Sequence, residues 1–242
     1  MALLRTAYFY VFLVIDVLIL VARYGPLKAK KDNVSKEEYE TLVGERVRKW
    51  AKRQMRNTGA KINIVGLENI PSGGVLFVGN HQSYFDIGLF LAFIEKNLGF
   101  IAKISVSKIP FIKNYTNDMR CIYLDRGNLR QNMKTILEGI QILKNNYSLV
   151  IFPEGTRNTT MDKFKAGSFK LATKAKVPIV PVTIDGAYKI LEKNKKLIRP
   201  ATVNMVIHPP IDTATLTKEE EQNLHITVRE IIANGMTSGH SA

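Results

Sequence analysis

From residue 61 onward the chain alternates apolar runs typical of β-strands with segments of helical periodicity, and this alternation constrains the fold most strongly. The strand-like runs lie at 62–65, 74–78, 99–102, 121–124, 148–152, 179–184 and 202–207, and the helical segments at 84–96, 128–145, 166–175 and about 217–234. Strands that alternate with helices build layered α/β domains with a largely parallel sheet. We therefore predict, over residues 61–242, an α/β domain with a central mixed, largely parallel sheet flanked by helices.

The first 60 residues have a different pattern. Residues 7–22 form the most hydrophobic block of the chain, and Gly25-Pro26 predicts a turn that ends its helix. A second helix is predicted after Ser35, a typical N-cap residue followed by two acids. We expect residues 1–60 to form a two-helix membrane-association motif ahead of the α/β domain.

The charge of the chain favours an anionic partner for this motif. The 242 residues carry a formal net charge of +14, and the segment 46–61 contains seven basic residues and no acid. Basic charge beside apolar surface is typical of contact with an anionic membrane rather than with nucleic acid. The single cysteine, Cys121, excludes a disulfide within the chain and favours a reducing, cytosol-facing location.

How residues 7–22 meet a membrane stays open at this stage. Sixteen helical residues span about 24 Å, whereas the apolar core of a bilayer is roughly 30 Å thick. Asp16 interrupts the block, and a carboxylate at mid-bilayer is costly. The block could span the membrane, lie in one leaflet or be a signal peptide, and the second helix could simply pack on the domain.

The run Asn80-His81-Gln82-Ser83-Tyr84-Phe85-Asp86 follows a strand-like stretch and carries candidate catalytic groups. A neutral imidazole accepts a hydroxyl proton as a general base, and a carboxylate on its other nitrogen fixes the tautomer. We expect His81 and Asp86 to form such a pair. Because Ser83-x-x-Asp86 is also a capping box, Asp86 could instead only cap the following helix.

A second run, Phe152-Pro153-Glu154-Gly155-Thr156-Arg157, ends another strand-like stretch. Gly155 permits a backbone turn, and an arginine grips phosphate in bidentate fashion. Arg126 and Lys103 also follow strand-like runs. Each cation alone is usually a solvated charge, but the three could converge on one phosphate.

Other chemistries lack support in the sequence. The nucleophile elbow G-x-S-x-G, the P-loop and the dinucleotide-binding glycine pattern are absent. The remaining histidines, His208, His225 and His240, have no spacing suited to a metal. We predict no metal site.

Four ordered segments together resemble the motifs of the glycerolipid acyltransferase family over roughly residues 60–210, within it most nearly the bacterial lysophosphatidic acid acyltransferases. They are 80–86, 123–126, 152–157 and 177–182. The resemblance implies transfer of a fatty acyl group from an acyl thioester to the sn-2 hydroxyl of lysophosphatidic acid, giving phosphatidic acid without a covalent acyl-enzyme. It implies no cofactor, with acyl carrier protein or coenzyme A as the acyl carrier.

The same resemblance assigns roles to residues. It implies His81 as the general base with Asp86 as its partner, and Lys103, Arg126 and Arg157 as ligands of the acceptor phosphate. Glu154 and Gly155 would organise the acceptor site. The expected location is the cytoplasmic face of the inner membrane.

Two other functions stay open from the sequence. One is acylation of glycerol 3-phosphate at sn-1, or of another lysolipid, by the same machinery. The other is a non-catalytic basic protein that binds a membrane surface or RNA.

Overall fold

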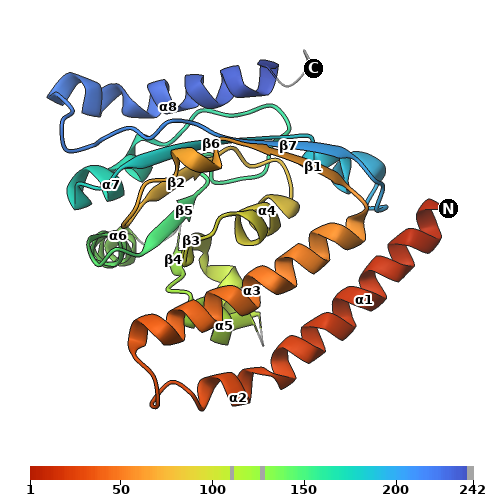
Figure 1. Cartoon of the computed structure of the whole chain (residues 1–242). Helices are drawn as coiled ribbons and strands as arrows, with labels where there is room; N and C mark the ends of the chain where they lie inside the picture. The colour runs from red at the N-terminus through yellow and green to blue at the C-terminus, as the bar shows by residue number, and fades with distance from the viewer. Residues whose placement is uncertain (110–111, 126–128, 239–242) are drawn as a thin grey trace. The chain divides into compact units, whose positions relative to one another are not determined.

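The computed structural model describes residues 1–109, 112–125 and 129–238 (Figure 1). It divides into two compact units. The helical unit comprises Met1–Asn63, Ser83–Asn97 and Gly186–Val203, and the sheet unit comprises Ile64–Gln82, Leu98–Asp185 and Asn204–Ala242. The division into 1–60 and 61–242 stays a prediction.

A seven-stranded sheet in the order β1-β7-β6-β2-β5-β3-β4 forms the scaffold. Strand β2 pairs in parallel with β5 and β6, β3 pairs in parallel with β5 and β4, and β6 pairs antiparallel with β7. The predicted mixed, largely parallel sheet is therefore confirmed. The strands are β1 (Lys61–Val65), β2 (Leu76–Gly79), β3 (Leu98–Lys103), β4 (Ile122–Leu124), β5 (Ser148–Ile151), β6 (Ile179–Asp185) and β7 (Thr202–Ile207).

The central strands read as continuous apolar runs because both of their faces are covered. Every residue of β2, β5 and β6 is buried, as expected for parallel strands between helical layers. The helices of the sheet unit are α5 (Ile112–Asp118), α6 (Leu129–Lys144), α7 (Lys170–Ala175) and α8 (Lys218–Ser238), with the 3-10 turns η1 (Leu67–Asn69), η2 (Ile104–Lys108) and η3 (Ala166–Phe169).

The helical unit is built on two long helices that lie side by side (Figure 1). Ser35 caps the second of them through a hydrogen bond from Glu38 N to Ser35 Oγ at 3.1 Å. Its C-terminus ends at Gly59, whose φ of 73° suits glycine. The unit contains α1 (Ala2–Ala22), α2 (Tyr24–Lys28), α3 (Lys36–Thr58), α4 (Phe85–Phe93), η4 (Ala187–Lys189) and η5 (Glu192–Asn194).

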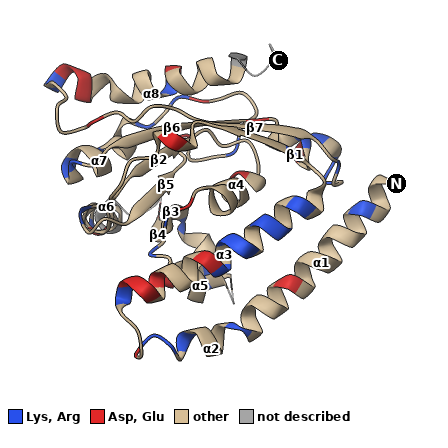
Figure 2. Ribbon diagram, in the orientation of Figure 1, with Lys and Arg blue, Asp and Glu red and all other residues tan. Residues whose placement is uncertain are grey.

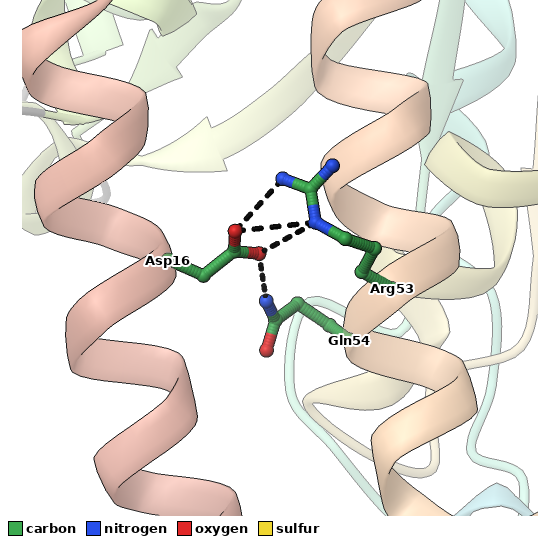
Figure 3. A network of polar contacts seen from close by, with 3 residues as sticks. All are labelled: Asp16, Arg53 and Gln54. Carbon is green, nitrogen blue, oxygen red and sulfur yellow. Dashed lines mark hydrogen bonds and ion pairs between the residues drawn. The ribbon is translucent and has the colours of Figure 1, made fainter.

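Asp16 of α1 joins the two long helices through a buried polar network (Figure 3). Its Oδ1 accepts Arg53 Nη2 at 2.8 Å, and its Oδ2 accepts Gln54 Nε2 at 2.6 Å. The acid that interrupts the apolar block is therefore neutralised by α3. Ala2–Lys28 is the one described helical stretch long and apolar enough, by length and composition, to cross a membrane.

Some local predictions were wrong. Gly25-Pro26 does not end a helix but lies inside α2, because proline is tolerated in the first turn. The apolar residues of α6 are only partly buried: Ile140 and Leu143 face inward, whereas Met133 and Leu137 are 68% and 62% exposed. Thr135 and Gly139 of α6 are buried as well.

Candidate active site

The carboxyl ends of β2, β5, β3 and β4 lie along one edge of the sheet, since these strands are mutually parallel. The register pairs Val78 with Ile151, so the loops that follow β2 and β5 begin next to each other. Loops at this edge carry the chemistry in most α/β sheets. The two sequence runs that hold the candidate catalytic and phosphate-binding residues start here.

His81 is fixed by the loop after β5 on three sides. Its backbone N donates to Glu154 Oε1 at 2.8 Å, and its carbonyl oxygen accepts Asn158 N at 2.8 Å. Its ring stacks on Phe152, with centroids 4.2 Å apart and planes at 17°. The structure therefore brings the two predicted motifs together around His81.

Glu154 is the link between these two motifs. Its side chain is buried, and its second oxygen, Oε2, accepts Asp162 N at 2.9 Å. Burial raises the pKa of this carboxyl, an effect that the hydrogen bonds from the backbones of Asp162 and His81 partly offset. Glu154 thus acts as a buried brace for the backbone beside the candidate base.

Gly155 and Arg157 follow this brace. The Gly155 N donates to the carbonyl oxygen of Phe152 at 3.0 Å, and its φ of 75° lies in the left-handed region that favours glycine. The tight turn carries the chain outward, and Arg157 is exposed. Arg157 therefore lies in the same loop as the brace, on the exposed part of that loop.

The other two predicted phosphate ligands belong to the neighbouring strands. Lys103 is exposed at the end of β3, in register with Leu124 of β4. Arg126 lies outside the described residues. The residue before it, Asp125, is held by Asn132, whose side-chain amide bonds both the Asp125 N, at 2.9 Å, and its carbonyl oxygen, at 2.6 Å.

Asn80 has a structural role that the sequence did not reveal. Its buried amide bonds both backbone groups of Ile184, with Nδ2 donating to the carbonyl oxygen at 2.8 Å and Oδ1 accepting the N–H at 2.8 Å. The side chain continues the pairing of β2 with β6 by one step. It therefore fixes where the chain leaves the sheet, one residue before His81.

Asp86 belongs to the helical unit, where it is fully buried at the start of α4. Its Oδ2 accepts Ser83 N at 2.8 Å, so the capping role is real. Glu192, which the sequence did not single out, accepts Ser83 Oγ at 2.9 Å and Tyr84 N at 3.0 Å. The pairing of Asp86 with His81 stays a prediction.

Among the described residues, neither His208 nor Cys121 forms a second catalytic centre. The described residues contain no group of three or more His, Cys, Asp or Glu side chains that could hold a metal. His208 shares a hydrogen bond of 2.8 Å with Thr183, and burial lowers its pKa. Burial raises the pKa of the Cys121 thiol to about 12, so it is a poor nucleophile.

The model of one protein family, Acyltransferase, matches residues 61–185, just over half of the chain. The chain belongs to the Acyltransferase family. The match covers β1 through β6 and so includes both loops around His81. The family resemblance predicted from the motifs is confirmed.

Relatives of this acyltransferase carry more specific names. The 1-acyl-sn-glycerol-3-phosphate acyltransferase of Borreliella burgdorferi is 33% identical over 177 residues, covering 72% of this chain and 71% of the relative. A probable 1-acyl-sn-glycerol-3-phosphate acyltransferase of Mycoplasma pneumoniae is 34% identical over 188 residues, covering 72% and 70%.

A solved structure extends the likeness of this acyltransferase to nearly its whole length. The 1-acyl-sn-glycerophosphate (LPA) acyltransferase PlsC from Thermotoga maritima is 30% identical, with a TM-score of 0.85. The match covers 99% of this chain and 96% of that one. The N-terminal helices are therefore part of the shared fold, and the prediction that the chain is an acyltransferase enzyme is confirmed.

Proposed function

We propose that this acyltransferase moves a fatty acyl group from an acyl thioester to the sn-2 hydroxyl of lysophosphatidic acid, giving phosphatidic acid. The names of the relatives support this acceptor. The observation that carries the chemistry is the Glu154 brace, which binds the His81 backbone to the loop that bears Arg157. Glu154 thus joins the loop of the base, His81, to the loop of the phosphate-binding cation, Arg157.

His81 acts as the general base. It takes the proton of the sn-2 hydroxyl while that oxygen attacks the thioester carbonyl, and the tetrahedral intermediate then collapses with loss of the thiolate. The imidazolium returns the proton to the departing sulfur, so no proton is gained or lost overall. General-base catalysis of this kind contributes about 10²–10⁴-fold. Stacking on Phe152 keeps the ring orientation, and Asp86 would hold its second nitrogen.

The acceptor phosphate binds to Arg157, with Lys103 and Arg126 as further ligands. All three follow strands that end at the same edge of the sheet as β2. A guanidinium and an ammonium together match a phosphomonoester in charge and geometry. Binding of the phosphate holds the glycerol hydroxyl next to His81, so the energy of phosphate binding is used to position the reacting group.

The enzyme meets its lipid at the membrane through its N-terminal helices. Ala2–Lys28 is apolar, and α3 is basic along its later turns. An apolar helix beside a basic one suits the headgroup region of an anionic leaflet. The proposed place is the cytoplasmic face of the inner membrane, where acyl carrier protein or coenzyme A supplies the thioester.

Product analysis tests the acceptor and the donor together. Purified protein would be given lysophosphatidic acid or glycerol 3-phosphate, each with acyl-coenzyme A or acyl carrier protein thioester, and products identified by mass spectrometry. We expect phosphatidic acid from lysophosphatidic acid. Acylation of glycerol 3-phosphate alone, or salt-sensitive lipid binding without any turnover, would contradict the proposal.

Direct transfer is tested separately. The intact mass of the enzyme mixed with acyl thioester in the absence of acceptor should stay unchanged. An acylated enzyme whose acyl group passes to added acceptor at the rate of turnover would overturn the direct mechanism, while leaving the choice of acceptor untouched.

A further inference from the structure

A hollow of about 270 Å³ lies in the helical unit where α1, α2 and α3 meet. Glu45 is the one acid among its lining residues. Figure 2 shows basic residues on α2 and α3, and α1, whose charged residues are Arg5 and Asp16. Five cations line the hollow, namely Arg23, Lys30, Arg46, Lys49 and Arg53.

The internal pairs leave most of this charge uncompensated. Arg53 is neutralised by Asp16, and Lys49 lies 3.4 Å from Glu45 in an exposed pair of little strength. Arg46 donates one guanidinium N–H to the carbonyl oxygen of Arg23 at 2.6 Å, which consumes no charge. Within the described residues, the side chains of Arg23 and Lys30 form no ion pair, so the hollow keeps an excess of positive charge.

The rest of the wall is aliphatic. Ile19 and Leu20 of α1, Leu27 of α2 and Leu42 of α3 line the hollow beside the cations. Ile19 also belongs to the apolar surface of α1, where Leu18 is 60% exposed and Ile15 51%. The cations suit the phosphate headgroup of a phospholipid, and the exposed apolar helix suits its acyl chains. A soluble polyanion would use only the cations.

We propose that this hollow binds the phosphate headgroup of an anionic phospholipid, whose acyl chains lie along the exposed apolar face of α1. The inference rests on the membrane attachment in the proposed function, and it adds a specific lipid site to it. Guanidinium and ammonium groups favour phosphate, and a basic pocket beside an apolar helix selects lipid headgroups. The site lies in the helical unit and uses none of the cations assigned to the acceptor phosphate.

Two double variants separate a site from a general basic surface. Lys30→Gln with Lys49→Gln removes two lining charges. Lys28→Gln with Lys52→Gln removes two exposed charges from the same stretch of chain and from the same helix, but neither lysine lines the hollow. Both pairs change the net charge equally, and all four side chains are exposed, so folding is not at risk.

The probe is a short-chain phosphatidylglycerol below its critical micelle concentration, titrated by calorimetry into the full chain. We expect one equivalent to bind, and the Lys30/Lys49 pair to weaken binding about tenfold or more, as for loss of a hydrogen bond to a charged group. The Lys28/Lys52 pair should change it less than about threefold, in line with exposed charges.

Further arms identify the ligand and the site. Short-chain phosphatidylcholine and glycerol phosphate should bind weakly or not at all, and Arg157→Gln should keep the phosphatidylglycerol site. Equal losses in the two double variants, equal binding of phosphatidylcholine or glycerol phosphate, or loss in Arg157→Gln would each overturn the proposal. Vesicle sedimentation tests membrane attachment itself, so its failure is distinguishable from failure of the lipid site.

Discussion

Asp16 and Glu154 are both buried carboxylates, yet the two units hold them in opposite ways. Asp16 is 4% exposed and meets a guanidinium and an amide from α3 (Figure 3). Glu154 is 5% exposed and accepts two backbone N–H groups, from His81 and Asp162. The first joins two helices by side chains, whereas the second fixes two loops by their backbones.

The difference assigns different tasks to the two acids. A buried carboxylate paired with a cation stabilises the fold only while both partners are present, because removing one leaves the other charge buried and uncompensated. A carboxylate that holds backbone N–H groups controls where a loop lies, and in this protein one of those loops carries His81. We therefore expect Asp16 to act mainly on stability and Glu154 mainly on turnover.

The largest stability effect should come from Asp16→Ala. The change leaves Arg53 without its acceptor, and we expect a loss of about 2–3 kcal/mol, below the full value for a buried pair because the Arg53 side chain is 38% exposed. Urea unfolding in detergent, followed by the fluorescence of Trp50 on α3, measures it. Replacing Asp16 and Arg53 together by leucine should restore most of the loss, and an unchanged midpoint in Asp16→Ala would break the comparison.

Glu154→Gln should act on turnover. Glutamine keeps the shape but has one acceptor oxygen, so it cannot serve both His81 N and Asp162 N. Loss of a hydrogen bond to a charged group costs about 1.5–3 kcal/mol, which predicts a fall in kcat of roughly tenfold to a hundredfold. Glu138→Gln, an exposed change on α6, is the control, and a normal kcat in Glu154→Gln would remove the brace from the account.

A smaller effect is expected from Glu192→Gln. This half-buried carboxylate holds Ser83 and Tyr84 at the start of α4, and glutamine can still accept one of the two bonds. We expect a loss of about 1 kcal/mol in the protection of the α4 backbone, measured by hydrogen exchange. Glu95→Gln, exposed just beyond α4, should leave protection unchanged. Equal protection in the two variants would show that Glu192 is not a cap.

The pH dependence of stability gives the smallest signal. Burial raises the Glu154 pKa above 4.5, so the folded state binds this proton more tightly than the unfolded state. The stability that the folded state gains from this tighter proton binding is fully present below the pKa of Glu154 in the unfolded state. It is lost as the pH rises through the pKa of Glu154 in the folded state. The difference in unfolding free energy between the wild type and Glu154→Gln should therefore change with pH between these two pKa values. A flat difference would show that the carboxyl is not perturbed.

Features with a local signal were predictable from the sequence. The strands were found because Leu76–Gly79, Ser148–Ile151 and Ile179–Asp185 are short, largely apolar runs, as is typical of buried strands. Because parallel strands end at one edge, the runs after β2 and β5 could be expected to meet. The position of the candidate site at this edge of the sheet could therefore be predicted from the sequence.

Features that depend on distant partners were not predictable. Asp16 seemed only to interrupt an apolar helix, because its partner Arg53 lies 37 residues away in the sequence. Glu154 is 73 residues from His81, whose backbone N–H it accepts. Helix α5 was missed because Ile112–Asp118 has no apolar periodicity. For Asp16 the sequence indicates only that a lone acid in an apolar helix needs a cation, and the basic helix that follows offers several, so the partner could not be chosen.

The central claim is that His81 is the base for acyl transfer to lysophosphatidic acid, and His81→Ala tests it most directly. Initial rates with lysophosphatidic acid and the acyl thioester, together with the dissociation constant of lysophosphatidic acid, would be measured for the wild type, for His81→Ala and for the control His225→Ala on α8. We predict that kcat falls about 10²–10⁴-fold in His81→Ala alone while lysophosphatidic acid still binds. Formation of phosphatidic acid by His81→Ala at the wild-type rate would contradict the account.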